Sequence, residues 1–179
     1  MGFLKKLVIV CAVLVAGVYV AGMTMPREHT VSSRIQLTAA RDSVWTVLRN
    51  FGDYPKWHPD FKSSVKGERR EGHEVWVQDV AGMTMSIELL EVQQPSLLVT
   101  EVITDEKSAW GGVWTYDLAA SGSGTEVTIT EAGWVKSPFN RVMMKLMGTH
   151  STMDGVLKHL GAKFGEQVIP DHVTVGPRA

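Results

Sequence analysis

Apolar and polar residues alternate through much of the chain between residues 29 and 135, a spacing typical of strands with one buried face. Val31, Ile35 and Leu37 alternate with polar residues and predict a first strand. Six more strands are predicted near residues 62–69, 73–80, 83–92, 97–104, 111–119 and 125–135, with turn residues between them. Because the connections are short, neighbouring strands are expected to be antiparallel.

Helical spacing is found in two further segments. Residues 38–51 place Val44, Val47, Leu48 and Phe51 on one face of a predicted helix. After Ser137, a suitable N-cap, and Pro138, apolar residues recur by threes and fours at Val142, Leu146, Thr149, Met153, Leu157, Leu160 and Phe164. This stripe predicts one terminal helix of roughly 27 residues, about 40 Å long. A twisted sheet of seven antiparallel strands can curl round such a helix, which predicts an α+β fold.

The N-terminal residues differ from the rest of the chain. Lys5 and Lys6 precede a run of nineteen apolar and small residues, 7–25, which would span roughly 28 Å as a helix. We interpret residues 1–6 as a short cytoplasmic N-terminus and residues 7–25 as a transmembrane anchor, with the domain outside the cytoplasm, in the periplasm if the source is bacterial. The alternative is a cleaved signal peptide, with Val20 and Gly22 at the cleavage site, which would make the protein secreted.

The remaining chain is interpreted as one folded domain, 29–166, followed by a flexible tail, 167–179. All 19 acidic residues and 16 of the 18 basic residues lie beyond residue 26, so the domain is mildly acidic. No basic run interleaved with aromatic residues is present, which argues against a nucleic-acid partner. Cys11, the one cysteine, lies in the apolar run and leaves the domain without a thiol.

Motifs for hydrolytic or nucleotide-dependent chemistry are absent from the sequence. His150 and Asp154 have the i, i+4 spacing of a metal or hydrogen-bonding pair, but a third ligand is missing. We therefore predict neither a metal nor a cofactor.

The segment "DYPKWHPDF", residues 53–61, combines two prolines with three aromatic residues and predicts a rigid, irregular and partly buried segment. Pro55 and Pro59 restrict its backbone, and Trp57 either edges a cavity or simply fills the core. His58, which precedes a proline, is expected at the surface.

The order of elements, together with "VWTVLRNFGDYPKWHPDFKSSV" (44–65), "GGVWTYDL" (111–118) and "SGTEVTITEAG" (123–133), resembles the START-like polyketide cyclase/dehydrase and lipid transport superfamily, SRPBCC. The resemblance covers residues 29–166. It implies a helix-grip fold, in which the sheet wraps the last helix around an apolar cavity. Members of this superfamily bind sterols, phospholipids, quinones and polyketides, and only some are enzymes.

A ligand cavity needs adaptable apolar walls and a few oriented polar groups. Glu101 and Glu131 interrupt apolar strand faces, and Tyr116 offers a hydroxyl. The simpler interpretation of each carboxylate is a strand end that reaches solvent. The candidate cavity residues are Trp57, Trp76, Glu101, Trp114, Tyr116, Glu131, Met143, Met147 and His150. Gly148 and Gly155 could admit a close strand or a kink that opens the cavity mouth.

Three functional classes follow from these observations. The favoured interpretation is a membrane-tethered domain that binds a hydrophobic small molecule such as a lipid, quinone or isoprenoid. The alternative is an enzyme of polyketide cyclase/aromatase type that uses an inward acid or Tyr116. A third interpretation is an interaction domain without a ligand.

Overall fold

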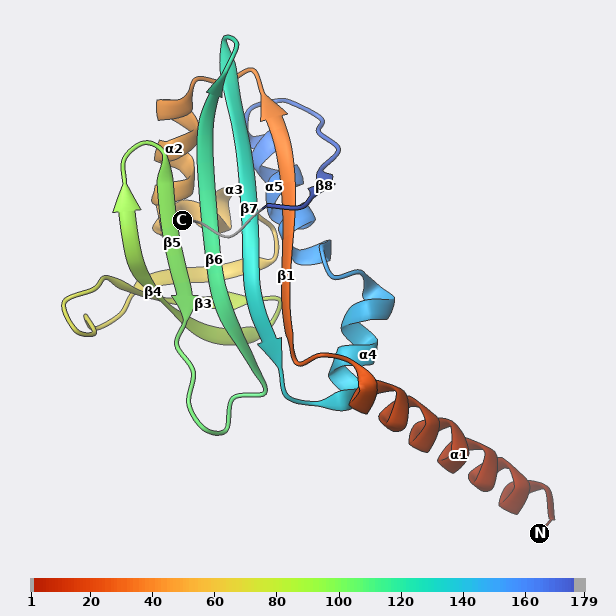
Figure 1. Ribbon diagram of the computed structural model, residues 1–179. Coiled ribbons are helices and arrows are strands. Elements are labelled where there is room, and N and C mark those ends of the chain that lie inside the picture. Colours follow the sequence, from red (N-terminus) through yellow and green to blue (C-terminus); the bar gives the residue numbers. More distant parts are fainter. Residues whose placement is uncertain (1, 176–179) are drawn as a thin grey trace.

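The computed structural model describes residues 2–175 and has an N-terminal helix, an antiparallel sheet and helices that pack on one face of that sheet (Figure 1). The helices are α1 (Gly2–Thr24), α2 (Arg41–Arg49), η1 (Phe51–Asp53), α3 (Tyr54–Trp57), α4 (Pro138–Met147) and α5 (Ser151–Lys163). The strands are β1 (Glu28–Leu37), β2 (Phe61–Lys66), β3 (Val75–Val80), β4 (Met83–Gln93), β5 (Leu97–Val102), β6 (Trp110–Ser121), β7 (Gly124–Val135) and β8 (Asp171–Val173). The predicted α+β class is confirmed.

The strands are hydrogen-bonded in the order β2-β3-β4-β5-β6-β7-β1-β8, and every neighbouring pair is antiparallel. The sheet therefore has eight strands and not the predicted seven. The extra strand, β8, lies in the segment expected to be a flexible tail, where His172 pairs with Ser33 of β1. Short strands are hard to predict from sequence, and β8 is stabilised by covering the edge that β1 would otherwise expose.

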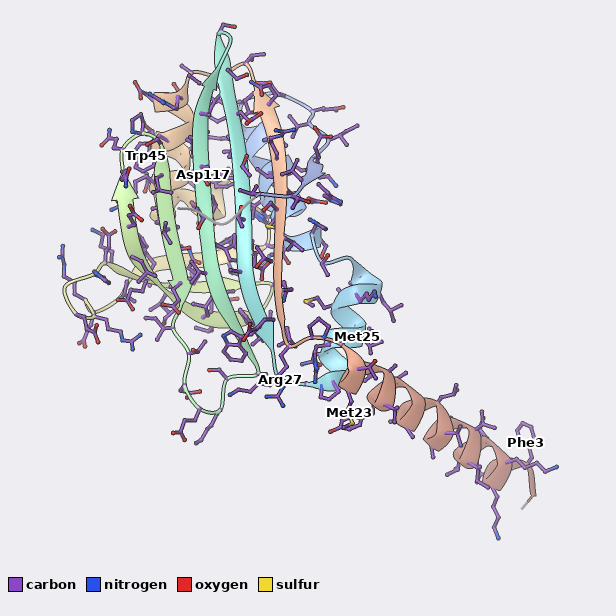
Figure 2. The ribbon with its side chains drawn as sticks, in the orientation of Figure 1. Phe3, Met23, Met25, Arg27, Trp45 and Asp117 are labelled. Atoms are coloured by element: carbon purple, nitrogen blue, oxygen red, sulfur yellow. The ribbon has the colours of Figure 1, made fainter. Side chains whose placement is uncertain are left out.

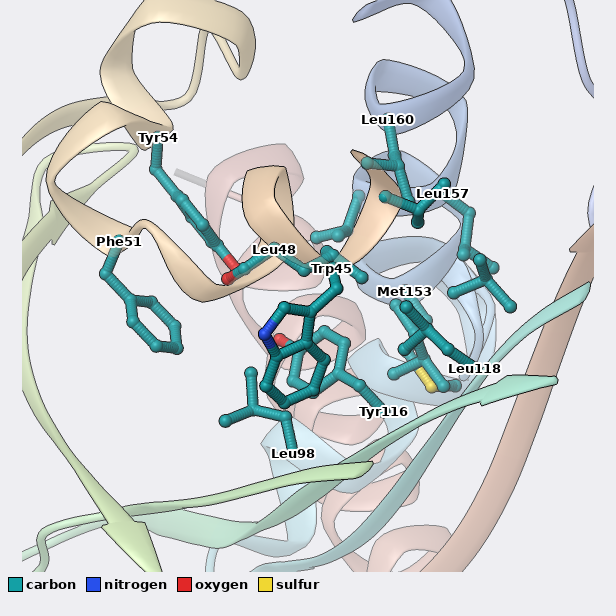
Figure 3. Packing of buried hydrophobic residues seen from close by; sticks show 14 of the residues in the cluster. Trp45, Leu48, Phe51, Tyr54, Leu98, Tyr116, Leu118, Met153, Leu157 and Leu160 are labelled. Carbon is teal, nitrogen blue, oxygen red and sulfur yellow. The ribbon is translucent and has the colours of Figure 1, made fainter. Parts of the chain in front are cut away.

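The core lies between the inner face of the sheet and helices α2 and α5 (Figure 3). Inward positions alternate along β7, where Val127 and Ile129 are completely buried. Leu157 and Leu160 of α5 are also completely buried, and Figure 3 shows them near Met153 and Leu118. The C-terminal half of the predicted helical stripe is thus confirmed as core.

The predicted single terminal helix is wrong, because the chain breaks at Gly148 into α4 and α5. Gly148 has φ +94°, a left-handed conformation that favours glycine, and it ends α4. The N-terminal cap was predicted correctly: the Ser137 side chain accepts a hydrogen bond from the Asn140 amide. Before the break, Leu146 is 75% exposed and Val142 is only partly buried, so the first part of the stripe is not core. The apolar spacing is continuous across the break, and Gly148, named above as the position of a possible kink, was the one signal for it in the sequence.

The aromatic segment 53–61 forms the end of η1, helix α3 and the turn into β2. Tyr54 is buried, and its hydroxyl donates a hydrogen bond to the Leu48 carbonyl oxygen at 2.8 Å. Its ring packs at 4.8 Å from the Trp57 ring and at 5.1 Å from the Phe61 ring. The prediction that His58 lies at the surface is wrong, since only 3% of His58 is exposed and its ring packs 4.4 Å from that of His159 on α5. The segment is rigid because it packs against α5 and β2.

Helix α1 projects away from the rest of the molecule, and almost all its side chains are exposed (Figure 2). Figure 2 places Phe3 at its far end and Met25 and Arg27 where it joins the domain. Its length of 23 residues and its apolar composition suit either a membrane span or a signal sequence.

Candidate functional site

The part of the sheet's inner face nearest α1 carries a group of polar and aromatic residues that no helix covers completely. Residues directly opposite each other in an antiparallel pair point to the same face. Glu131 of β7 lies opposite both Val31 of β1 and Trp114 of β6, and Tyr116 is the next inward residue on β6. All of these except Tyr116 are only partly buried. Trp114, Tyr116 and Glu131 thus share the inner face, and their role as cavity residues stays a prediction.

His29 joins this group from the start of β1. Its Nε2 atom lies 3.6 Å from Oε1 of Glu131, too far for a direct hydrogen bond but close enough for an ion pair when the imidazole is protonated. The two side chains are 14% and 22% exposed. Neither ring nitrogen of His29 has a hydrogen-bond partner among the described residues, although both are buried. Unpaired buried nitrogens are uncommon in native proteins and are frequent at functional sites.

Two glycines form the floor beneath this pair. Gly133 lies opposite His29 and also opposite Gly112, so two strands lack side chains at the same point of the inner face. A Cβ atom at Gly133 would lie 2.8 Å from the His29 ring and 3.1 Å from Oε1 of Glu131. Only glycine leaves room there for both side chains. We call His29, Gly112, Trp114, Glu131 and Gly133 the inner-face site.

The charge of Glu131 reaches two titratable neighbours. Burial, and next the Glu131 carboxylate, raise the pKa of Tyr116, so that the phenol remains a neutral hydrogen-bond donor. Burial and the adjacent His172 lower the pKa of His150, although the charges of Asp154 and Glu131 oppose this. Burial therefore favours the uncharged form of both residues, and the Glu131 carboxylate supports this at Tyr116 but opposes it at His150.

His150 and Asp154 lie in a polar cluster with Ser33 and His172. The Asp154 carboxylate accepts a hydrogen bond from Ser33 at 2.7 Å and pairs with His172 at 3.0 Å, while the His150 and His172 rings stack at 3.8 Å. The described residues contain no group of three or more metal-binding side chains. The order Ser33–Asp154–His172 is also unlike a nucleophilic triad, in which histidine lies between the other two. This cluster attaches β8 to α5 and β1.

A protein-family model described as polyketide cyclase / dehydrase and lipid transport matches residues 28–165. The chain belongs to the polyketide cyclase/dehydrase and lipid transport family. No curated protein matches the chain.

Solved structures share this family's fold. A START superfamily protein from Mycobacterium smegmatis aligns with a TM-score of 0.62 and 16% identity over 75% of this chain and 96% of that one. An aromatase/cyclase, ZhuI, from Streptomyces sp. R1128 aligns with a TM-score of 0.62 and 14% identity, over 76% and 93% of the two chains. The di-domain aromatase/cyclase BexL aligns with a TM-score of 0.64 and 11% identity over 79% of this chain, which spans about half of BexL (52%). At such identities the likeness concerns the fold alone.

Other predicted site residues of this family member lie elsewhere. Glu101 is exposed on the outer face, where it lies opposite Val113 and Glu88. Its placement in the cavity was wrong because both faces of β5 are apolar, and Leu98 and Thr100 are the residues that point inward. Trp76 is buried against Phe51 and donates a hydrogen bond from Nε1 to Glu74 at 2.7 Å.

The other predicted site residues differ in burial and in their neighbours; they are Trp57, Met143, Met147 and His150. Trp57 is half-buried in the aromatic segment, and its Nε1 atom has no hydrogen-bond partner within residues 2–175. Met143 and Met147 lie on α4 and are 37% and 72% exposed, so they do not belong to a closed cavity wall. His150 lies between α4 and α5, within the electrostatic reach of Glu131.

An apolar cavity was predicted between the sheet and the terminal helix. In this family member core side chains fill the space beside α5. Two open hollows lie on other surfaces. One of about 620 Å³ is lined by Glu91, Gln93, Ser96, Leu97, Asp117, Leu118 and Ala119, and one of about 410 Å³ by Trp45, Thr46, Arg49, Asn50, Lys66, Glu74, Trp76 and Gln94. In the second hollow, Arg49 and Glu74 form an ion pair with 2.7 Å between Nη2 and Oε2, so these two charges neutralise each other. We favour the inner-face site, because both ring nitrogens of His29 lack a hydrogen-bond partner among the described residues.

Sequence reasoning missed His29 and Gly133. His29 continues the inward alternation of Val31, Ser33 and Ile35, which was a usable signal. Its proximity to Glu131 depends on the register of two strands about a hundred residues apart, which local patterns do not specify.

Proposed function

We propose that this domain binds a hydrophobic small molecule at the inner-face site while α1 anchors it to a membrane. Family membership supports the ligand class, and the apolar α1 supports the anchor. The observation that carries the proposal is the partly exposed His29–Glu131 pair over a glycine floor.

The chemistry of the site suits a mainly apolar molecule with one polar group. Glu131 can accept a hydrogen bond from a ligand hydroxyl or amine, and either His29 nitrogen can accept or donate one according to its tautomer. Trp114 and Val31 supply apolar contacts beside them. Lipids, quinones and isoprenoids that carry a hydroxyl or carbonyl group are the classes that fit.

The same pair favours a second candidate, an enzyme of the cyclase/aromatase type. Glu131 near His29 is an acid–base pair, and neutral Tyr116 is a nearby hydroxyl donor. In this candidate Glu131 would remove a proton from a bound polyketide-like substrate.

The test begins with mass spectrometry of organic extracts from the protein purified natively with α1 intact. A hydrophobic compound in stoichiometric amount is expected, and its affinity is then measured for Glu131→Gln and for the matched control Glu101→Gln on the outer face. Glu131→Gln should weaken binding by about 1–3 kcal/mol, the range for a buried hydrogen bond, and Glu101→Gln should not change it.

Equal affinities in both variants would contradict the proposed site. Product formation that Glu131→Gln lowers by ~10²–10⁴-fold with binding retained would favour the enzyme.

A further inference from the structure

Helix α4 carries an apolar stripe that the described residues leave partly or largely exposed. The exposed fractions are 47% for Phe139, 37% for Met143, 75% for Leu146 and 72% for Met147. Spacings of four, three and one residue place these side chains on one side of the helix. Contiguous exposed apolar surface of this kind marks an interaction site.

The start of α4 is fixed to the end of α1. Gly22, the one buried residue of α1, lies against Pro138 in the first turn of α4. The Arg141 guanidinium donates hydrogen bonds to the carbonyl oxygens of Met25 and Lys136. Figure 1 shows α4 running across the line of α1 and not continuing it. A helix with this placement lies along the surface of any bilayer that α1 crosses.

The charges of α4 also suit a membrane surface. Residues 132–153 contain no Asp or Glu, whereas Lys136, Arg141 and Lys145 are basic. At 100° per residue, Arg141 and Lys145 lie roughly 175° and 145° from the middle of the apolar stripe. Arg141 is buried, so the exposed basic residues are Lys136 and Lys145. An apolar face with exposed basic side chains beside it is the composition of helices that lie in the interface of anionic bilayers.

We propose that α4 is an interfacial helix that inserts Phe139, Met143, Leu146 and Met147 into the surface of the bilayer that α1 spans. The proposal rests on the proposed anchoring by α1. The break at Gly148 separates α4 from α5, so that α4 lies on the lipid while α5 stays in the core. The inner-face site then opens beside the membrane, where a hydrophobic ligand is stored.

The test uses the full chain with Cys11→Ser and a single new cysteine, labelled with an environment-sensitive fluorophore and reconstituted into phosphatidylcholine/phosphatidylglycerol vesicles. Leu146→Cys reports the apolar face, Lys145→Cys the opposite face of the same helix, and Ser123→Cys the distant β6–β7 turn. The native Cys11, labelled in the unmodified chain, reports whether α1 is in the bilayer. Nitroxides on the lipid acyl chains and aqueous iodide serve as the two quenchers.

The label at position 146 should be quenched several-fold more by the acyl-chain nitroxide than labels at 145 and 123, and should be shielded from iodide. Lipid quenching at Cys11 with none at 146 would overturn the docking of α4 but keep the anchor. Shielding of the label at position 146 from both quenchers would mean that another protein surface covers α4, which overturns the proposal. If the shielding is lost at one protein per vesicle, that surface belongs to a second copy of the chain. If it persists, α4 closes onto the sheet of its own chain. Absence of lipid quenching at both 11 and 146 would overturn the anchor and the docking together.

Discussion

The His29 ring lies over Gly133, and the inner-face site exists because Gly133 has no side chain. A Cβ atom there would meet both His29 and Glu131 within 3.1 Å. Neighbouring inward positions on β7 carry the full side chains of Val127 and Ile129, which fill the core. Along one strand, residue size thus decides where the inner face is packed and where it is open.

His58 provides a pH-dependent contribution to stability. Burial, and next the nearby His159, lower the pKa of His58 from 6.5 to about 4. Because the unfolded chain binds this proton more strongly, the contribution is complete above pH 6.5 and is lost as the pH falls towards 4. We expect a loss of up to about 3 kcal/mol in the free energy of unfolding over this range.

The measurement is urea unfolding in detergent at several pH values, followed by tryptophan fluorescence. His58→Gln removes the titrating group, so its free energy of unfolding should depend less on pH between 6.5 and 4. Parallel pH curves for the two proteins would show that His58 does not titrate in this way.

Among the elements, α4 and α5 share one apolar spacing but have opposite environments. Leu157 on α5 is completely buried, whereas Met143 on α4 is 37% exposed. The left-handed backbone at Gly148 separates the two helices, so the buried core includes side chains of α5 while the apolar side chains of α4 stay partly or largely exposed.

Leu157→Ala should therefore reduce the free energy of unfolding by about 2–5 kcal/mol, because it leaves a cavity in the core. Met143→Ala removes a partly exposed side chain and should cost less than about 1 kcal/mol. Both values come from urea unfolding at neutral pH. Similar losses for the two variants would indicate that α4 packs as tightly as α5.

The whole molecule consists of a folded domain and a projecting apolar helix, joined where α1 meets α4 (Figure 1). The family model matches the domain, residues 28–165, and the match does not include α1. Lys5 and Lys6 precede the apolar run, which favours an N-terminus in the cytoplasm.

We expect the full chain to stay in the membrane pellet after a carbonate wash, with the domain accessible to protease added outside the cytoplasm. The mass of the purified protein checks whether α1 is retained. A soluble protein whose N-terminus begins near Met23 would identify α1 as a cleaved signal.

Local patterns determined the class of the fold and the strand positions up to residue 135, and N-cap preference determined the Ser137 cap. These features depend on neighbours within a few residues, and such patterns are present in the chain itself. The apolar N-terminal run was likewise readable from composition.

Only the tertiary structure decided which residues meet. The faces of β5 are both apolar, so alternation could not show that Glu101 points outward. The pairing of β8 with β1 and the approach of His29 to Glu131 join segments about a hundred residues or more apart. The break at Gly148 interrupts a stripe that remains continuous in sequence. Strand register and helix docking are set by the global packing of the core, and local spacing is compatible with several such arrangements.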